Sequence, residues 1–246
     1  MPLWEGWVQN WEVRLHYLTN APVALGESSP LVIVPGTAEA AEDYADLLEA
    51  LAPRRCLALS LRGRGQSSSP QRGYRLIDHA TDVEALVNAL DLPPFCLMGY
   101  SRGVVYALAY AVRQPARLAG LILGDYPAHH PAMPPEWIAR FLESTCRGIP
   151  VSERLMPHVA EGLQREAEDI PLWDFLPGIT CPVLILRGGQ PGSRLSVEAT
   201  ERYLELLPDA RVVRLEDSGH ALWEPDYGLY VVTIGGFLER LDAARR

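Results

Sequence analysis

The chain has 246 residues, of which 48% are hydrophobic and 22% are charged, a composition typical of a folded protein with a sizeable core. Its formal net charge of -9 disfavours phosphate backbones and anionic membrane surfaces, so neither nucleic acid nor a membrane is an expected partner. The four cysteines have neither the spacing of a metal site nor that of a disulfide framework. Because the N-terminus also lacks the basic and then apolar order of a signal peptide, we expect a cytoplasmic protein.

The strand signals follow one another along the chain. Residues 11–17 alternate apolar and polar side chains, which is the period of a half-buried edge strand. The later signals are short, continuous apolar runs, as expected for parallel strands that are covered on both faces. These runs are residues 31–34, 56–59, 95–98, 121–123 and 183–186, with residues 211–215 as one further candidate.

Helical patterns lie between these runs. Apolar residues recur at helix spacing in residues 44–51, 83–90 and 234–241. The alternation of strands and helices predicts an α/β fold with a mainly parallel central sheet and helices on both of its faces.

One segment interrupts this alternation. From about residue 126 to residue 178, prolines precede helical stretches and no strand signal intervenes, which predicts a small inserted helical cap. Residues 1–125 and 179–246 then form the core domain. Trp137 and Phe141 belong to an apolar stripe that faces either the core domain or a bound ligand, and we take both as candidate substrate-binding residues. Trp173 and Phe175 are further candidates for an apolar lining.

A glycine-bracketed serine follows one of the predicted strands. Residues 99–103 read Gly-Tyr-Ser-Arg-Gly and connect the strand at 95–98 to a helical pattern at 104–112. Small residues at these positions permit a sharp turn between strand and helix that exposes the serine hydroxyl at the carboxyl edge of the sheet. Ser101 is therefore the predicted nucleophile.

Two further segments supply what a serine nucleophile needs. The loop Pro35-Gly36-Thr37-Ala38 follows an early strand, and we expect the backbone N–H groups of Thr37 and Arg102 to form an oxyanion hole. His220 lies in a loop after the last predicted strand, where an imidazole can take the proton of the serine hydroxyl. The order from nucleophile to histidine along the chain favours His220 as the general base.

With these motifs, residues 11–241 resemble the α/β-hydrolase superfamily. Residues 61–67, Leu-Arg-Gly-Arg-Gly-Gln-Ser, are similar to a loop that follows an early strand in small esterases and lipase-like hydrolases. The resemblance implies a serine hydrolase without metal or cofactor that cleaves an ester or related acyl bond of a small apolar substrate through an acyl-enzyme on Ser101. Hydrolysis of a carbon–carbon bond in a diketone is an alternative. Haloalkane dehalogenases and epoxide hydrolases have Asp at the position of the nucleophile, so Ser101 argues against both.

The carboxylate that completes a catalytic triad departs from the common family pattern. Family members commonly carry it after the strand that corresponds to residues 182–187, but residues 188–193 contain no acid. Some members carry it after the preceding strand, which makes Asp125 our candidate. Other acids also come into question, namely Glu39, Glu216 and Asp217. A Ser–His dyad, or a catalytically silent fold that binds a small ligand, is the remaining alternative, and the sequence does not indicate an oligomeric state.

Overall fold

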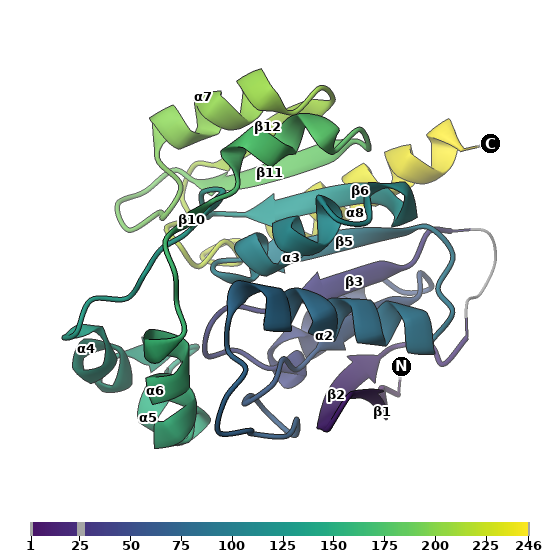
Figure 1. The fold of residues 1–246 in the computed structure, drawn as a ribbon. Coiled ribbons are helices and arrows are strands. Elements are labelled where there is room, and N and C mark those ends of the chain that lie inside the picture. Colours follow the sequence, from purple (N-terminus) through teal and green to yellow (C-terminus); the bar gives the residue numbers. More distant parts are fainter. Residues whose placement is uncertain (1, 24–27, 246) are drawn as a thin grey trace.

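The computed structural model describes residues 2–23 and 28–245 and contains an eight-stranded sheet in the order β1-β2-β4-β3-β5-β6-β11-β12 (Figure 1). The strands are β1 (Trp4–Asn10), β2 (Val13–Thr19), β3 (Leu31–Val34), β4 (Cys56–Leu59), β5 (Phe95–Tyr100), β6 (Leu118–Gly124), β11 (Val183–Gly188) and β12 (Ala210–Leu215). Among these strands, only the pairs β1–β2 and β2–β4 are antiparallel, and the other five pairs are parallel. The prediction of a mainly parallel sheet is confirmed.

Helices cover both faces of the sheet, as predicted. The helices are the 3₁₀ helix η1 (Ala41–Tyr44), α1 (Ala45–Ala50), α2 (Leu76–Ala89), α3 (Gly103–Ala111), the 3₁₀ helix η2 (Pro115–Arg117), α4 (Trp137–Glu143), α5 (Val151–Arg154), α6 (Pro157–Arg165), the 3₁₀ helix η3 (Trp173–Gly178), α7 (Val197–Leu206) and α8 (Tyr227–Ala244). Side chains of α2, α3 and α7 share one core with Val32 and Val34 of β3, whereas α1 and α8 share another core with Leu31 and Ile33. Successive residues of a strand face opposite cores, so residues on both faces of the strand must be apolar. This explains the continuous apolar runs.

The prediction of an edge strand at residues 11–17 is wrong in its position. The edge strand is β1, and β2 lies between β1 and β4 inside the sheet. Trp11 does not belong to either strand, because it lies in the connecting turn with a φ of 52° and is 90% exposed. A short antiparallel hairpin of this kind leaves a weak signal in the sequence, since β1 lacks a strict alternation of apolar and polar residues.

Residues 126–178 connect β6 to β11 and contain α4, α5, α6 and η3. Figure 1 shows α4, α5 and α6 grouped beyond the ends of the sheet strands. The segment also contains two small ladders that the sequence did not predict, formed by β7 (His129–His130) with β10 (Ile170–Pro171) and by β8 (Thr145–Cys146) with β9 (Ile149–Pro150). Val151 and Val159 of this segment pack with Ala38 and Tyr74 in a separate apolar cluster. The segment is thereby anchored beside the loop that follows β3.

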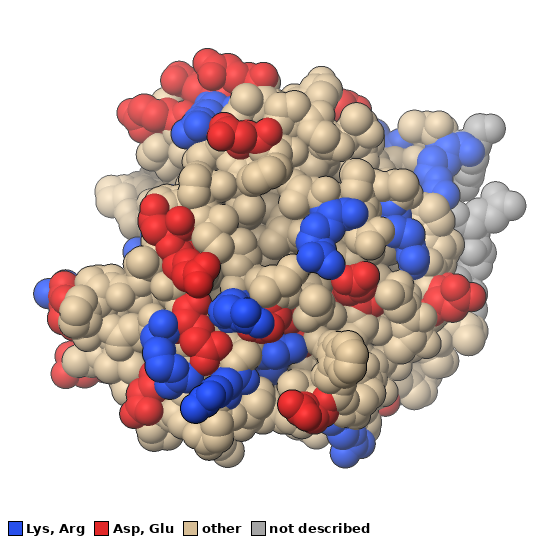
Figure 2. All heavy atoms as spheres, in the orientation of Figure 1, with Lys and Arg blue, Asp and Glu red and all other residues tan. Residues whose placement is uncertain are grey.

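Acidic groups are prominent on the surface. Figure 2 shows acidic side chains gathered over α7, which carries Glu198, Glu201 and Glu205. No helix in the described part of the chain is long and apolar enough to span a membrane.

Candidate active site

The turn between β5 and α3 brings Ser101 to the carboxyl edge of the sheet. Ser101 has a φ of 51°, in the left-handed region that residues with a side chain rarely adopt. The flanking glycines permit the turn, because a Cβ on Gly99 would lie 2.6 Å from the carbonyl oxygen of Gly103, and a Cβ on Gly103 would lie 2.3 Å from that of Val34. The N–H of Ser101 donates to the carbonyl of Gly124 at 2.8 Å, which ties the turn to the end of β6.

Three of the predicted site residues meet in one chain of hydrogen bonds. His220 Nε2 lies 2.9 Å from the Oγ of Ser101, and His220 Nδ1 lies 2.8 Å from the Oδ2 of Asp125. Since both ring nitrogens are engaged, no ring nitrogen is left for Asp217 or Glu216. The geometry therefore favours Asp125 among the acids that the sequence left open.

The loop of residues 188–194, which contains no acidic residue, keeps Asp125 ionised. Its Oδ1 accepts hydrogen bonds from Ser193 Oγ at 2.5 Å and from the N–H of Gly188 at 3.2 Å, and its Oδ2 accepts one from the N–H of Arg194 at 2.8 Å. Burial alone would raise the pKa of Asp125, but the hydrogen bonds from His220, Ser193 and the two amides outweigh burial and lower it. Because β6 and β11 are neighbours in the sheet, an acid at the end of either strand is near the same histidine loop.

Aromatic residues hold the imidazole of His220 in place. The ring of Tyr100 stacks on the imidazole with 5.1 Å between centroids and an interplanar angle of 24°. The Tyr100 hydroxyl donates to the carbonyl oxygen of His220 at 2.7 Å, and Trp223 contacts the ring of Tyr100 edge-on. Burial raises the pKa of Tyr100 well above its usual value, which keeps this hydroxyl protonated as a donor.

The loop after β3 lies against the serine. A Cβ placed on Gly36 would come within 3.3 Å of the Cβ of Ser101. In the turns and loops of the described residues, the N–H groups of Thr37 and Arg102 do not donate to any backbone carbonyl. Both residues line the hollow above Ser101, so both amides remain candidates for an oxyanion hole.

Glu39 fixes this loop instead of serving as an acid for His220. One of its oxygens, Oε2, accepts hydrogen bonds from the N–H of Gly36 at 2.8 Å and from the hydroxyl of Tyr44 at 2.7 Å. The other, Oε1, accepts one from Nε of Arg147 at 2.6 Å. Arg147 also places its guanidinium over the ring of Trp223 at 3.7 Å. A residue of the segment 126–178 thus contacts both the loop after β3 and the loop that carries His220.

Comparison with known proteins agrees with the fold described above. Residues 29–145 match the family described as the alpha/beta hydrolase fold, and N-formylmaleamate deformylase of Pseudomonas putida is 26% identical over an alignment of 255 residues that covers 92% of this chain and 93% of that protein. The chain has the α/β-hydrolase fold. A proline iminopeptidase of Mycobacterium smegmatis has the same fold, with a TM-score of 0.79, 19% identity and coverage of 98% of this chain and 100% of the other. The esterase RhEst1 from Rhodococcus also shares it, with a TM-score of 0.78, 23% identity and coverage of 98% and 100%.

A cavity of about 630 Å³ opens over Ser101 and His220. Trp137 and Phe141 line it and stack on each other, with 4.4 Å between ring centroids. The cavity is not uniformly apolar, because its lining includes three arginines, Arg102, Arg147 and Arg194.

The two other aromatic candidates of the sequence analysis do not line this cavity. Trp173 packs in the core against Tyr203, and Phe175 is 58% exposed on the surface. The aromatic residues of η3 therefore contribute to packing and surface rather than to the lining.

Several residues that line the cavity were missed by the sequence analysis. Tyr126, Arg147, Arg194 and Trp223 all line the cavity. Tyr126 and Trp223 lie close in sequence to Asp125 and His220, which is the only signal that could have pointed to them. No cluster of three or more histidine, cysteine, aspartate or glutamate side chains suited to a metal ion occurs in the described part of the chain.

Proposed function

We propose that this chain is a serine hydrolase that cleaves a carboxylic ester or a related acyl bond, such as an amide, in a small molecule. The observation that carries the proposal is the hydrogen-bonded chain from Ser101 through His220 to the buried carboxylate of Asp125, which faces a cavity of about 630 Å³. A serine hydroxyl becomes an effective nucleophile only when a base takes its proton, and this arrangement supplies that base.

In the proposed acylation step, His220 Nε2 takes the proton of Ser101 as Oγ forms a bond to the carbonyl carbon of the substrate. The carbonyl oxygen becomes an oxyanion, which the N–H groups of Thr37 and Arg102 stabilise. The tetrahedral intermediate then collapses, the bond to the leaving group breaks, and the imidazolium returns the proton to that group. Asp125 stays ionised throughout and stabilises the imidazolium.

In the proposed deacylation step, water takes the place of the leaving group. His220 removes a proton from the water, and the resulting oxygen nucleophile attacks the acyl carbon on Ser101. Collapse of the second tetrahedral intermediate releases the acid and restores the serine hydroxyl. Neither step requires a metal or an organic cofactor.

The names of two similar proteins support acyl chemistry. One relative is a deformylase and one structural neighbour is an esterase, and both names describe removal of an acyl group. Residues 126–178 act in this proposal as a cap that shapes the cavity, with Trp137 and Phe141 against the substrate. A carbon–carbon bond hydrolase would use the same residues, and a substrate panel that includes a diketone distinguishes the two. The silent ligand-binding alternative rested on a missing acid, and the hydrogen bond between Asp125 and His220 argues against it.

The test is covalent labelling with a fluorophosphonate probe, followed by peptide mass spectrometry. We expect a single adduct on Ser101 and a loss of ester hydrolysis of about 10⁴-fold or more in the Ser101→Ala variant. Ser144→Ala is a matched control, because Ser144 also lines the cavity but donates its hydroxyl to the carbonyl of Phe141. Labelling at another residue, or unchanged hydrolysis by Ser101→Ala, would refute the proposal.

A further inference from the structure

Arg102 is a buried cation beside the nucleophile. It is 3% exposed, and within the described residues it forms no ion pair with a carboxylate. The acceptors of its guanidinium are neutral: the Nε2 of His130 at 2.8 Å, the carbonyl of Pro131 at 3.2 Å and the sulfur of Met133 at 3.4 Å. Its Nε has no hydrogen-bond partner in the described part of the chain. A buried guanidinium without a counter-charge is costly, so its presence needs a reason.

His130 cannot supply the missing negative charge, and it also stays uncharged itself. Its Nδ1 donates to the carbonyl of Glu168 at 2.8 Å, so its Nε2 serves as the acceptor for Arg102. Burial, together with the charge of Arg102, lowers the pKa of His130 to about 4. The positive charge of Arg102 is therefore not neutralised by the groups that hold it.

Other arginines of the molecule differ from Arg102 either in their partners or in their position. Arg62 forms two hydrogen bonds to the carboxylate of Asp82, at 2.6 and 2.8 Å, and the partly buried Arg54 pairs with Asp242. Arg55 and Arg64 are also buried without a carboxylate partner among the described residues, but neither lines the cavity over Ser101. Arg102 alone among these five combines a buried, unneutralised charge with a position in the cavity wall.

The other charged side chains of the cavity wall do not neutralise the positive charge of Arg102. The negative charge of Glu39 is paired with Arg147, and Arg194 adds an exposed guanidinium at the rim. Tyr126 also lines the cavity, and Arg102 is near enough to oppose the rise that burial causes in the pKa of its hydroxyl. The cavity is thus locally positive in a chain with a formal net charge of -9.

We propose that the substrate carries a carboxylate group, and that the Arg102 guanidinium binds it while the acyl carbonyl lies over Ser101. The inference rests on the proposed acyl chemistry and narrows it to acid-bearing esters or amides, in place of the apolar substrate that the sequence suggested. Thioether sulfur is a weak acceptor, so a carboxylate can displace Met133 from Arg102 and use the planar guanidinium as a two-pronged donor. Arg102 then has two separate roles, one for its backbone N–H and one for its side chain.

The test compares pairs of esters that differ in one carboxylate. The first pair, mono-4-nitrophenyl glutarate and 4-nitrophenyl valerate, places the charge on the acyl side. The second pair, 4-acetoxybenzoate and its methyl ester, places the charge on the leaving group. Rates are corrected for spontaneous hydrolysis. We expect the wild-type protein to prefer the carboxylate in at least one pair by about 10- to 100-fold in kcat/KM.

Arg102→Gln should reduce this preference to about onefold, and Arg102→Lys, which keeps the charge but not the planar fork, should retain part of it. The preference ratio is the readout, because both variants can also change the absolute rate through the neighbouring oxyanion hole. Arg113→Gln is the control, since Arg113 pairs with Glu84 away from the cavity and its loss should leave the ratio unchanged.

Fluorophosphonate labelling separates failure of this inference from failure of the proposed function. A wild-type protein that labels at Ser101 but shows no preference in either pair overturns the carboxylate inference and leaves the serine mechanism intact. A persistent preference in Arg102→Gln that still labels would also overturn it. If Arg102→Gln does not fold, the wild-type ratios and the Arg102→Lys ratios decide the question.

Discussion

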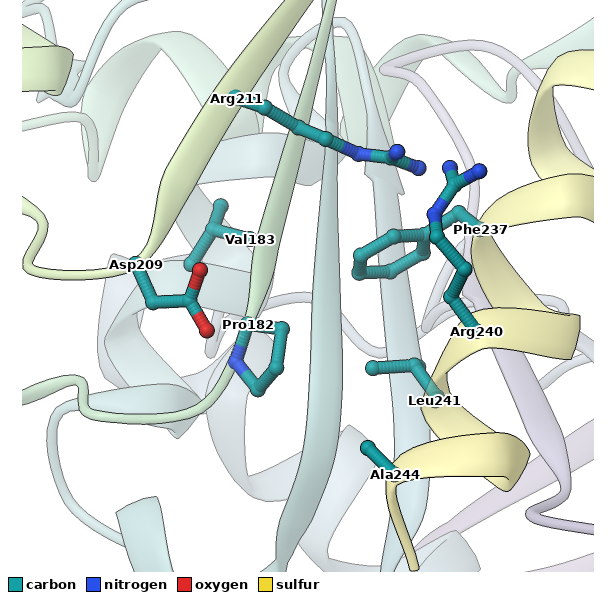
Figure 3. A pocket seen from close by; sticks show the side chains of 8 residues that line it. All are labelled: Pro182, Val183, Asp209, Arg211, Phe237, Arg240, Leu241 and Ala244. Carbon is teal, nitrogen blue, oxygen red and sulfur yellow. The ribbon is translucent and has the colours of Figure 1, made fainter.

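Two of the hollows that the described residues form contain arginines, and these two lie at opposite ends of the parallel strands. The cavity over Ser101 lies at the carboxyl ends, whereas a second hollow of about 260 Å³ lies where β11 and β12 begin, beside the end of α8. Figure 3 shows Arg211 and Arg240 pointing toward one another in the second hollow, with Asp209 on its opposite side and Leu241 and Ala244 below. Both are therefore hollows that arginine side chains line, although they differ in volume.

The hollows differ in the groups that converge on them. In the second hollow, the guanidinium of Arg211 lies over the ring of Phe237 at 5.1 Å, and two of its nitrogens, Nε and Nη2, have no partner among the described residues. At the carboxyl end, Ser101 and Asp125 adopt positive φ, and loops from distant parts of the chain supply hydrogen bonds to both. Arginines in a hollow do not by themselves make an active site. An active site of this kind also needs a nucleophile, a base and an acid, and strained, hydrogen-bonded loop ends can bring these groups together.

Asp125→Asn provides the strongest test of this contrast. The amide cannot stabilise an imidazolium and favours the wrong tautomer of His220, so we expect kcat to fall by about 10⁴-fold while the fold is retained. Ester hydrolysis and the rate of fluorophosphonate labelling measure the effect. Arg211→Gln, in the second hollow, should leave both unchanged. Equal rates in Asp125→Asn and wild type would mean that another acid orients His220, and a loss of activity in Arg211→Gln would contradict the separation of the two hollows.

Much of the fold was predictable from the sequence because the parallel strands are buried on both faces. A continuous apolar run such as residues 31–34 leaves few interpretations when a helical pattern follows it. The hairpin of β1 and β2 was misplaced for the opposite reason, since an exposed edge strand places few constraints on its residues. The small ladders β7–β10 and β8–β9 are two residues long in each strand, which is too short for a periodic signal.

The site was predictable where chemistry requires a local motif, and not where it depends on contacts across the chain. Ser101 and His220 follow from their loops, while Asp125 was a candidate only through the family resemblance. Its donors come from residues 188–194, more than 60 positions away, and no residue pattern there indicates the contact. Arg147 and Glu39 are 108 positions apart, so their ion pair becomes visible only in the folded protein.

His130, which lies behind the cavity over Ser101, should make the free energy of unfolding depend on pH. Its pKa is lowered to about 4 in the folded protein, against a usual value of 6.5, so the unfolded chain binds a proton between these pH values and the folded protein does not. Stability is therefore lost as pH falls from about 6.5 to about 4, by about 3 kcal/mol in total. His79, whose pKa burial also lowers, contributes in the same direction.

His130→Gln should remove this share of the acid sensitivity, because glutamine can still accept from Arg102 and does not titrate. Urea unfolding at pH 7 and pH 4.5 measures the difference. We expect Arg211→Gln to keep the wild-type dependence, since it belongs to the other hollow. An equal loss of stability in His130→Gln and wild type would show that His130 is not the group that titrates.

Glu39→Gln tests whether the loop after β3 depends on the ion pair with Arg147. The substitution removes the charge that Arg147 pairs with, and it weakens the acceptor for the N–H of Gly36 beside Ser101. A loop held less firmly should bind the oxyanion less well in the transition state, while binding of the ground-state substrate changes little. We therefore expect kcat to fall by about 10-fold with a nearly constant KM, and Arg147→Met to have a similar effect that does not add to it. Asp43→Asn is the matched control, because Asp43 pairs with Arg154 of the same inserted segment but does not contact Gly36. An equal fall in kcat for Asp43→Asn would mean that any link between the inserted segment and the core has this effect, and that Glu39 has no particular role in holding the loop.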